Sequence, residues 1–328
     1  MQNIVPQKLK KGDEVRILAP STGIKIIGAD CRQIAKERFE AMGLRVTFGR
    51  NTTDENFDMM GSSEAELRAA DIMDAFRDEN VKAIFTIIGG FNSNQVLPLL
   101  DYEVIKQNPK ILCGFSDITA LLDGIRAKTG LVVFYGPHYS SIGMKKGCEY
   151  TLDCLQKVLF DGVCDIKPSQ AWSDDLWFLD QENRQMVQNE GWWVIHEGVA
   201  KGELAGGNLG TLLLLNGTPY QPKWEKETVL AVEDCFTAAA ADAKYFLRQL
   251  QALTQREDFK NVKAVLIGRF QKESNVSREL LMHIVDRITE LKNIPVIANL
   301  DFGHTTPIAT LPLGGETMVQ NDVVKVCW

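Results

Sequence analysis

A serine at a predicted strand-to-helix turn, in Gly114-Phe-Ser116-Asp-Ile118, is the residue best suited to act as a nucleophile. The hydroxyl at such a turn is exposed, and the N–H groups that start the helix have no partner within it, so they can bind an oxyanion. The competing interpretation is that Ser116 or Asp117 only caps the helix, and the second glycine of G-x-S-x-G is missing. The turn therefore needs partners before it implies catalysis.

A serine hydroxyl is a weak nucleophile until a base takes its proton, and the chain has only four histidines. His304 lies in a polar turn after the predicted strand 295–300, and His138, after a Gly-Pro pair, is the second choice. His283 falls within a predicted helix and His196 stands beside two tryptophans, so both are expected to be structural or surface residues. We therefore expect His304 to be the base.

A catalytic imidazole needs an acid that fixes its tautomer and stabilises its charged form. Glu233 closes the apolar predicted strand 228–232 and is followed by Asp234. A carboxylate at the end of a buried strand is costly unless it is paired, which favours a role in the site. The alternative is that Glu233 or Asp234 caps the next helix.

Two glycine pairs are candidates for backbone recognition. Gly89-Gly90 offers a tight turn whose N–H could be an oxyanion donor beside that of Asp117. Gly206-Gly-Asn-Leu-Gly210 superficially resembles a phosphate-binding loop, but we expect no strand of the required kind before it. A dinucleotide site is therefore not expected there.

The elements that position these residues alternate in the first half of the chain. Strands are predicted at 15–19, 81–88 and 110–114, and the capping box Ser63-Glu-Ala-Glu66 is expected to start a helix. Alternating strands and helices indicate a parallel sheet covered by helices. Ligands of such sheets bind beyond the carboxyl ends of the strands, where Gly89 and Ser116 fall.

The pattern loosens from about residue 137 to 200, which we interpret as a domain connection plus a long loop. Regular patterns return with predicted strands at 228–232 and 262–267, so a second α/β unit closes the chain. We predict a nucleophile-bearing domain over 1–167 and a second domain over 168–328. The irregular stretch holds four of the six tryptophans, at positions 172, 177, 192 and 193.

Composition narrows the class of protein. A chain of 328 residues with 45% hydrophobic and 24% charged residues is long enough for two globular domains. The net charge of -7 disfavours nucleic acid and anionic membranes as partners. The seven cysteines contain no CxxC pair, which predicts neither a disulfide framework nor a zinc site. The N-terminus lacks the apolar core of a signal peptide and no stretch is long enough to span a bilayer, so we expect a cytoplasmic protein.

Five sequence blocks, in order, resemble the signature of the LD-carboxypeptidase family, which includes murein tetrapeptide carboxypeptidases and microcin C self-immunity proteins. The resemblance extends from about Gly12 to the C-terminus. The blocks are Gly89–Asn94, Gly114–Thr119, Gly206–Leu209, Val232–Asp234, and Gly303–Pro307 with Leu311–Gly314.

The resemblance implies an α/β fold with an N-terminal Rossmann-like, flavodoxin-like parallel-sheet domain and a smaller β-rich C-terminal α/β domain. It implies a triad in which Ser116 is the nucleophile, His304 the base and Glu233 the residue that orients the base. The backbone N–H groups of Gly90 and Asp117 would form the oxyanion hole. Family members need no metal or organic cofactor and are commonly homodimers.

The expected function is serine carboxypeptidase-type hydrolysis of an amide bond in a peptide-nucleotide, microcin C-like substrate. One alternative is release of terminal D-alanine from murein tetrapeptide, and another is a non-catalytic module that binds a small ligand. Trp172 and Trp177 resemble the aromatic loop of the microcin C branch and are expected either to stack on a base or to pack a domain interface. Asn92, Ser93 and Asn208 are candidates to bind the polar end of the substrate.

Overall fold

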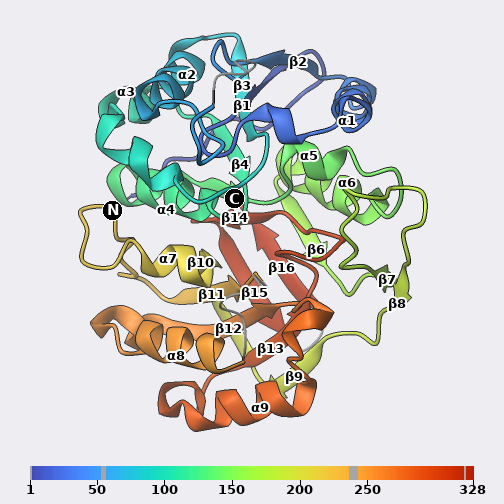
Figure 1. Cartoon of the computed structure of the whole chain (residues 1–328). Helices are drawn as coiled ribbons and strands as arrows, with labels where there is room; N and C mark the ends of the chain where they lie inside the picture. The colour runs from blue at the N-terminus through green and yellow to red at the C-terminus, as the bar shows by residue number, and fades with distance from the viewer. Residues whose placement is uncertain (1, 53–56, 236–242, 321–322) are drawn as a thin grey trace.

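Two β-sheets with flanking helices make up the protein, as the computed structural model shows (Figure 1). The structure describes residues 2–52, 57–235, 243–320 and 323–328. In Figure 1 the first sheet, mostly blue to green, lies above the second sheet, which is mostly yellow to red. Within the described ranges, no helix is long and apolar enough to cross a membrane.

The first sheet has the order β14-β5-β4-β3-β1-β2 among the described residues. Strands β1 to β5 are parallel, and β14 is antiparallel to β5. From β2 the order is 2-1-3-4-5, as in flavodoxin-like sheets, so the predicted fold of this half is confirmed. The bounds are β1 Glu14–Leu18, β2 Arg45–Phe48, β3 Val81–Thr86, β4 Ile111–Gly114, β5 Val133–Tyr135 and β14 Leu311–Leu313.

Helices connect these strands. In α2 the apolar residues Ala69, Ile72 and Phe76 recur at helical spacing and are all buried. The capping box predicted at Ser63 is wrong, because α2 begins after Glu64 and no side chain caps it; the Ser63 carbonyl instead accepts a hydrogen bond from a buried arginine. The bounds are α1 Ala29–Ala41, α2 Ala65–Arg77, α3 Tyr102–Gln107, α4 Ile118–Thr129, α5 Tyr139–Ile142 and α6 Glu149–Gln156.

The second sheet has the order β6-β16-β15-β10-β11-β12-β13-β9 in the described part of the chain. Strands β10 to β13 are parallel, and the strands on both sides of them are antiparallel. Helices α7 Leu209–Leu213, α8 Ala243–Thr254 and α9 Arg278–Arg287 belong to this half. The strands are β6 Val163–Ile166, β9 Trp193–His196, β10 Val199–Asn208, β11 Thr228–Glu233, β12 Val262–Gly268, β13 Val296–Leu300, β15 Glu316–Gln320 and β16 Val323–Cys327.

The glycines that resemble a phosphate-binding loop lie inside strand β10. A phosphate-binding loop needs a strand that ends before its glycines, whereas β10 continues through them to Asn208. A Cβ on Gly206 would lie 1.8 Å from the carbonyl oxygen of Ala231 on β11, and one on Gly207 would lie 2.7 Å from the Thr119 side chain on α4. These glycines allow close approach between strands and between the two halves of the molecule.

The two halves exchange strands. Strand β6 precedes most of the second half yet pairs with β16 at the edge of the second sheet, while β14 returns to the first sheet. One buried apolar cluster accordingly contains residues of both halves, such as Phe134, Leu204 and Val326. The predicted boundary between 167 and 168 stays a prediction.

The stretch interpreted as a connection plus a long loop is more regular than expected. It contains α5, α6, β6 and β9, together with the short antiparallel pair β7 Ala171–Trp172 and β8 Val187–Gln188. The irregular part lies between β6 and β9 and includes Trp172, Trp177 and Trp192, while Trp193 begins β9.

Candidate active site

The turn between β4 and α4 holds Ser116 in a strained conformation. Its φ angle is 61°, in the left-handed region that a non-glycine residue seldom adopts. Such strain is a mark of serine nucleophiles on strand-to-helix turns. The capping interpretation is wrong, because Asp117 occupies the N-cap position of α4 but no side chain caps the helix.

Three distant residues meet at this turn. His304 Nε2 lies 3.0 Å from Ser116 Oγ, although the two residues are 188 positions apart. His304 Nδ1 lies 2.7 Å from Glu233 Oε2. Ser116 follows β4 in the first sheet, Glu233 ends β11 in the second, and His304 lies in the turn after β13. The three side chains thus form one hydrogen-bonded chain across the junction of the two halves.

Glu233 is fully buried and its carboxylate is saturated with donors. Besides His304, Tyr135 Oη donates to Oε1 at 2.6 Å and Asn208 Nδ2 donates to the same oxygen at 3.0 Å. Burial raises the pKa of the Glu233 carboxyl, but the charge of His304 and the three hydrogen bonds outweigh it, so this pKa lies below its usual value. Glu233 is therefore held as an anion.

The Glu233 carboxylate changes the pKa of the His304 imidazole. Burial lowers the pKa of His304, but the negative charge of Glu233 and the hydrogen bonds that the imidazole makes to Cys235 and Glu233 raise it well above its usual value. The neighbouring Asp234 differs, since burial and the charge of Glu233 raise the pKa of its carboxyl to about 6. His304 is thus a strong base that becomes neutral only as the pH rises.

The predicted oxyanion donors lie on two turns that are tied together. In the described part of the chain, the N–H groups of Gly90 and Asp117 donate no hydrogen bond. The Asp117 carboxylate accepts from Ser21 Oγ at 2.7 Å and from the N–H of Ser93 at 2.9 Å. A Cβ on Gly89 would lie 3.0 Å from the Cβ of Ser116, so only glycine lets the turns approach this closely. These contacts between the two turns were not predicted from the sequence.

A cavity of about 480 Å³ opens beside Ser116 and His304. None of its described lining residues is a lysine or an arginine. Its wall includes exposed or half-buried apolar side chains, which suit a flat or apolar ligand group. The residues of that wall are Ile26, Phe91, Leu176, Trp177 and Phe178.

The two tryptophans proposed for substrate binding differ in position. Trp177 lines the cavity, and its half-buried ring meets Phe178 edge to face at 6.0 Å. Trp172 does not line it. The ring of Trp172 instead lies 5.1 Å from the guanidinium of Arg269 and 5.0 Å from Lys272 Nζ.

The polar residues expected to bind the substrate lie outside the cavity lining as the structure describes it. Asn92 Nδ2 donates to Ser62 Oγ at 2.9 Å, and Arg68 Nη1 donates to the Asn92 carbonyl at 3.1 Å. Ser93 Oγ donates to the carbonyl of Asp117 at 2.7 Å. Together with Asn208 behind Glu233, these side chains support the site rather than face its cavity.

His138, the second choice for the base, lies under the two turns. Its Nδ1 is 2.7 Å from Thr86 Oγ1, and its ring stacks on Phe115 at 4.2 Å. Burial lowers the pKa of His138 well below its usual value, so the ring is neutral. His304 rather than His138 lies within hydrogen-bond distance of Ser116. His196 and His283 pair with Asp286 and Arg287, far from this site in sequence.

No group of three or more histidine, cysteine, aspartate or glutamate side chains able to hold a metal occurs among the described residues. All seven cysteines are free thiols.

Comparison with known proteins shows the family of the chain. Residues 15–136 match the model of the LD-carboxypeptidase N-terminal domain, and residues 201–319 match that of the LD-carboxypeptidase C-terminal domain. The chain belongs to the LD-carboxypeptidase family. It is a serine carboxypeptidase-type hydrolase, and the predicted family, fold class and enzyme class are confirmed.

Relatives within the family have different names. A putative carboxypeptidase of Treponema pallidum is 49% identical over 97% of this chain and 92% of its own length. The microcin C7 self-immunity protein MccF of Escherichia coli is 29% identical over 96% of this chain and 92% of its own. A probable murein peptide carboxypeptidase of Bacillus subtilis is 27% identical over 97% and 92%.

Solved structures share the whole fold. An MccF-like protein from Bacillus anthracis superposes with a TM-score of 0.95 at 44% identity, covering 99% of both chains. A variant of MccF in complex with adenosine monophosphate superposes with a TM-score of 0.87 at 28% identity, covering 99% of this chain and 98% of its own.

Proposed function

We propose that this protein hydrolyses an amide bond in a peptide-nucleotide, microcin C-like substrate through a triad of Ser116, His304 and Glu233. The observation that supports it is the hydrogen-bonded chain from the Ser116 hydroxyl through His304 to a buried, anionic Glu233. This is the arrangement that activates a serine for acyl transfer.

In the first half-reaction, neutral His304 takes the proton of Ser116 Oγ as the oxygen attacks the scissile carbonyl carbon. The carbonyl oxygen becomes an oxyanion, which the N–H groups of Gly90 and Asp117 bind. The C–N bond then breaks, and the protonated His304 gives its proton to the leaving nitrogen. Water, deprotonated by His304, attacks the acyl-enzyme ester and releases Ser116.

The cavity favours a nucleotide-bearing substrate. Trp177, Phe178 and Phe91 present aromatic surface to it, and stacking of a base on one aromatic side chain contributes roughly 1–3 kcal/mol. The MccF relative has been solved with adenosine monophosphate bound. These features support a nucleotide portion held against the aromatic wall.

Murein tetrapeptide is the second candidate, because a family relative is named a probable murein peptide carboxypeptidase. Its terminal D-alanine carries a carboxylate, which is best recognised by arginine or lysine. The described lining of the cavity offers neither, and it includes the acidic residues Asp174 and Asp175. A phosphate would meet the same carboxylates, so the preference for the peptide-nucleotide rests on the aromatic wall, which suits a base.

Product analysis by mass spectrometry separates the two candidates. The protein is incubated with an aminoacyl sulfamoyl adenosine and, separately, with murein tetrapeptide, with Ser116→Ala protein as the control. We expect the first substrate to be cleaved at its amide bond at least tenfold faster, measured as kcat/KM. Faster release of D-alanine from the tetrapeptide would instead assign the enzyme to murein.

The non-catalytic alternative is tested by labelling. A fluorophosphonate probe should modify Ser116, whereas a simple ligand-binding module would not react. Homodimer formation and a cytoplasmic location remain predictions from the sequence, and light scattering after size exclusion tests the first of them.

A further inference from the structure

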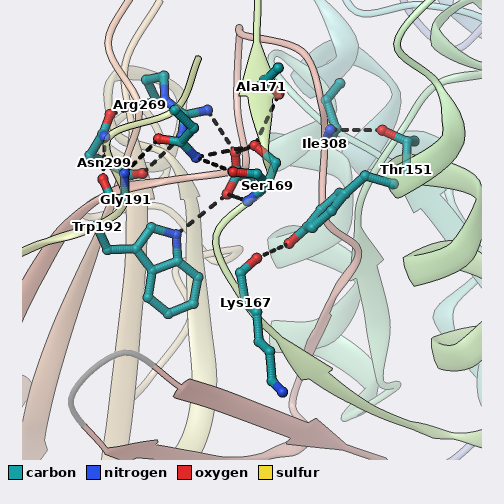
Figure 2. Close-up of polar contacts among 12 residues, drawn as sticks. Thr151, Lys167, Ser169, Ala171, Gly191, Trp192, Arg269, Asn299 and Ile308 are labelled. Carbon is teal, nitrogen blue, oxygen red and sulfur yellow. Dashed lines mark hydrogen bonds and ion pairs between the residues drawn. The ribbon is translucent and has the colours of Figure 1, made fainter.

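Residues at the ends of β12 and β13 belong to a buried polar network (Figure 2). Arg269 Nη1 and Asp301 Oδ1 form an ion pair at 2.7 Å, with the two side chains 2% and 0% exposed. Ser169 Oγ donates to the same Asp301 oxygen at 2.6 Å, and the Ser169 N–H donates to Oδ2 at 3.0 Å. The Asp301 carboxylate thus joins a strand end to a residue from the irregular segment.

Both ends of that irregular segment are fixed at the same place. We call residues 169–192 the arm. At its start Ser169 binds Asp301, and at its end Trp192 Nε1 donates to Asp301 Oδ2 at 3.4 Å (Figure 2). Asn299 Nδ2 also donates to the Gly191 carbonyl at 2.7 Å. The arm therefore leaves and rejoins the fold at one cluster of buried polar groups.

The first half of the arm forms one wall of the cavity. Residues 173–178 line the cavity, Trp177 among them. Ser173 and Thr306 exchange two backbone hydrogen bonds of 2.9 and 2.8 Å. Thr306 belongs to the turn that starts at Asp301 and carries His304. The arm is thus attached both at its two ends, through Asp301, and at Ser173 to the turn that carries His304.

Arg269 connects the network to the arm a second time. One side of its guanidinium pairs with Asp301, and the Trp172 ring lies 5.1 Å from the guanidinium carbon. Trp172 therefore holds its part of the arm against Arg269 instead of lining the cavity. Neither Arg269, Asp301 nor Ser169 lines the cavity as the structure describes it, so their effect on a ligand must pass through the arm.

We propose that Ser169, Asp301 and Arg269 are positioning residues that hold the arm, and with it Trp177, against the His304 turn, and so set the affinity for the nucleotide portion of the substrate. This inference rests on the proposed function. A buried carboxylate shared by an arginine and a serine is stable only while all its partners are present. Removal of one hydroxyl is the mildest change that loosens the arm.

The test is a double-mutant cycle on ligand binding, made in Ser116→Ala protein so that no turnover interferes. The dissociation constant of adenosine monophosphate is measured by calorimetry for Ser169→Ala, Trp177→Ala and the combination. Ser169→Ala should weaken binding about tenfold, which is what loss of one hydrogen bond to a charged group produces. In the Trp177→Ala background it should have no further effect, because both act through one contact.

Controls separate positioning from general loss of structure. Ser169→Thr keeps the hydroxyl and should restore binding to within about twofold. Thr228→Val removes another buried hydroxyl, which donates to the Lys226 carbonyl at the start of β11, and should leave binding unchanged. If Ser169→Ala protein does not fold, Trp192→Phe replaces it, since this change removes the indole donor to Asp301 and keeps an aromatic ring at the position.

Additive effects of the Ser169 and Trp177 changes would overturn the inference, as would unchanged binding in Ser169→Ala or absence of nucleotide binding to Ser116→Ala protein. Hydrolysis of the substrate by Ser116→Ala protein would overturn the proposed function instead. The two failures are therefore distinguishable.

Discussion

Replacement of Glu233 by glutamine keeps the shape of this buried side chain and removes its charge. Tyr135 and Asn208 both donate hydrogen bonds to Oε1, so the amide oxygen of the glutamine must occupy that position. The amide nitrogen then faces His304 Nδ1, where Glu233 Oε2 lies at 2.7 Å. Because the amide N–H donates to Nδ1, the imidazole carries its own proton on Nε2, which faces Ser116. Nε2 then has no lone pair free to accept the proton of the Ser116 hydroxyl.

The expected loss is large and changes with pH in a defined direction. A carboxylate-to-amide change at the orienting position of a serine protease lowers kcat about 10⁴-fold, and we expect a loss of about 10³- to 10⁴-fold in Glu233→Gln. Because Glu233 raises the pKa of His304 and burial lowers it, removal of the charge lowers this pKa. Activity requires neutral His304, so the acid limb of kcat/KM against pH shifts to lower pH.

The assay is kcat/KM from pH 5 to 10 for wild type and Glu233→Gln, with Asp234→Asn as a matched carboxylate-to-amide control. The control should lose less than about tenfold, because Asp234 pairs with neither triad partner in the structure. A Glu233→Gln plateau within tenfold of wild type, or an acid limb at an unchanged pH, would refute the reasoning.

Three further predictions concern Tyr135, two tryptophans of the arm and Asp123. Tyr135→Phe removes a 2.6 Å donor to Glu233 and should lower kcat about ten- to a hundredfold without changing the far-ultraviolet circular dichroism spectrum. Trp177→Ala should raise KM for a nucleotide-bearing substrate about tenfold, whereas Trp172→Ala should raise it less, and equal effects would contradict the placement of the two rings. Burial raises the pKa of Asp123 to about 7, and neither carboxyl oxygen has a described partner. The folded state therefore binds a proton that the unfolded state has lost between about pH 4 and 7, and stability falls with rising pH across that window. Asp123→Asn should raise Tm at pH 8 more than at pH 5, and an equal change at both values would contradict this.

The residues of the hydrogen-bonded chain could be found from sequence because each stands where a strand ends. Ser116, Glu233 and His304 all follow apolar strand patterns, and strand ends of an α/β sheet are where polar side chains reach a site. Their contact with one another depends on how the two halves meet, which the resemblance to a known family implied and periodicity did not.

The supporting residues could not be predicted, because their partners are distant in sequence. Tyr135 ends a short apolar strand, and nothing in that strand's pattern indicates that its hydroxyl reaches Glu233, 98 positions away. Asn208 was a candidate to bind the polar end of the substrate, and the resemblance suggested that Trp172 stacks on a base or packs a domain interface. In the structure Asn208 donates to Glu233 and the Trp172 ring lies beside Arg269. A hydrogen bond across a domain junction leaves no periodic signal in either segment.

Strand exchange between the halves was equally hidden. Strand β14 is three residues long, and its position in the sequence would assign it to the last domain. It instead completes the edge of the first sheet beside β5. Pairing between distant short strands is decided by tertiary packing rather than by local propensity. The same exchange brings the His304 turn over the Ser116 turn.

The most direct test of the central claim is to trap the covalent intermediate. Protein is mixed with a slowly hydrolysed aminoacyl ester, quenched in acid and digested, and the peptides are analysed by tandem mass spectrometry. The account predicts an added mass equal to the acyl group on the oxygen of Ser116, and none in Ser116→Ala protein. An adduct on another residue, or undiminished turnover by Ser116→Ala protein, would contradict it.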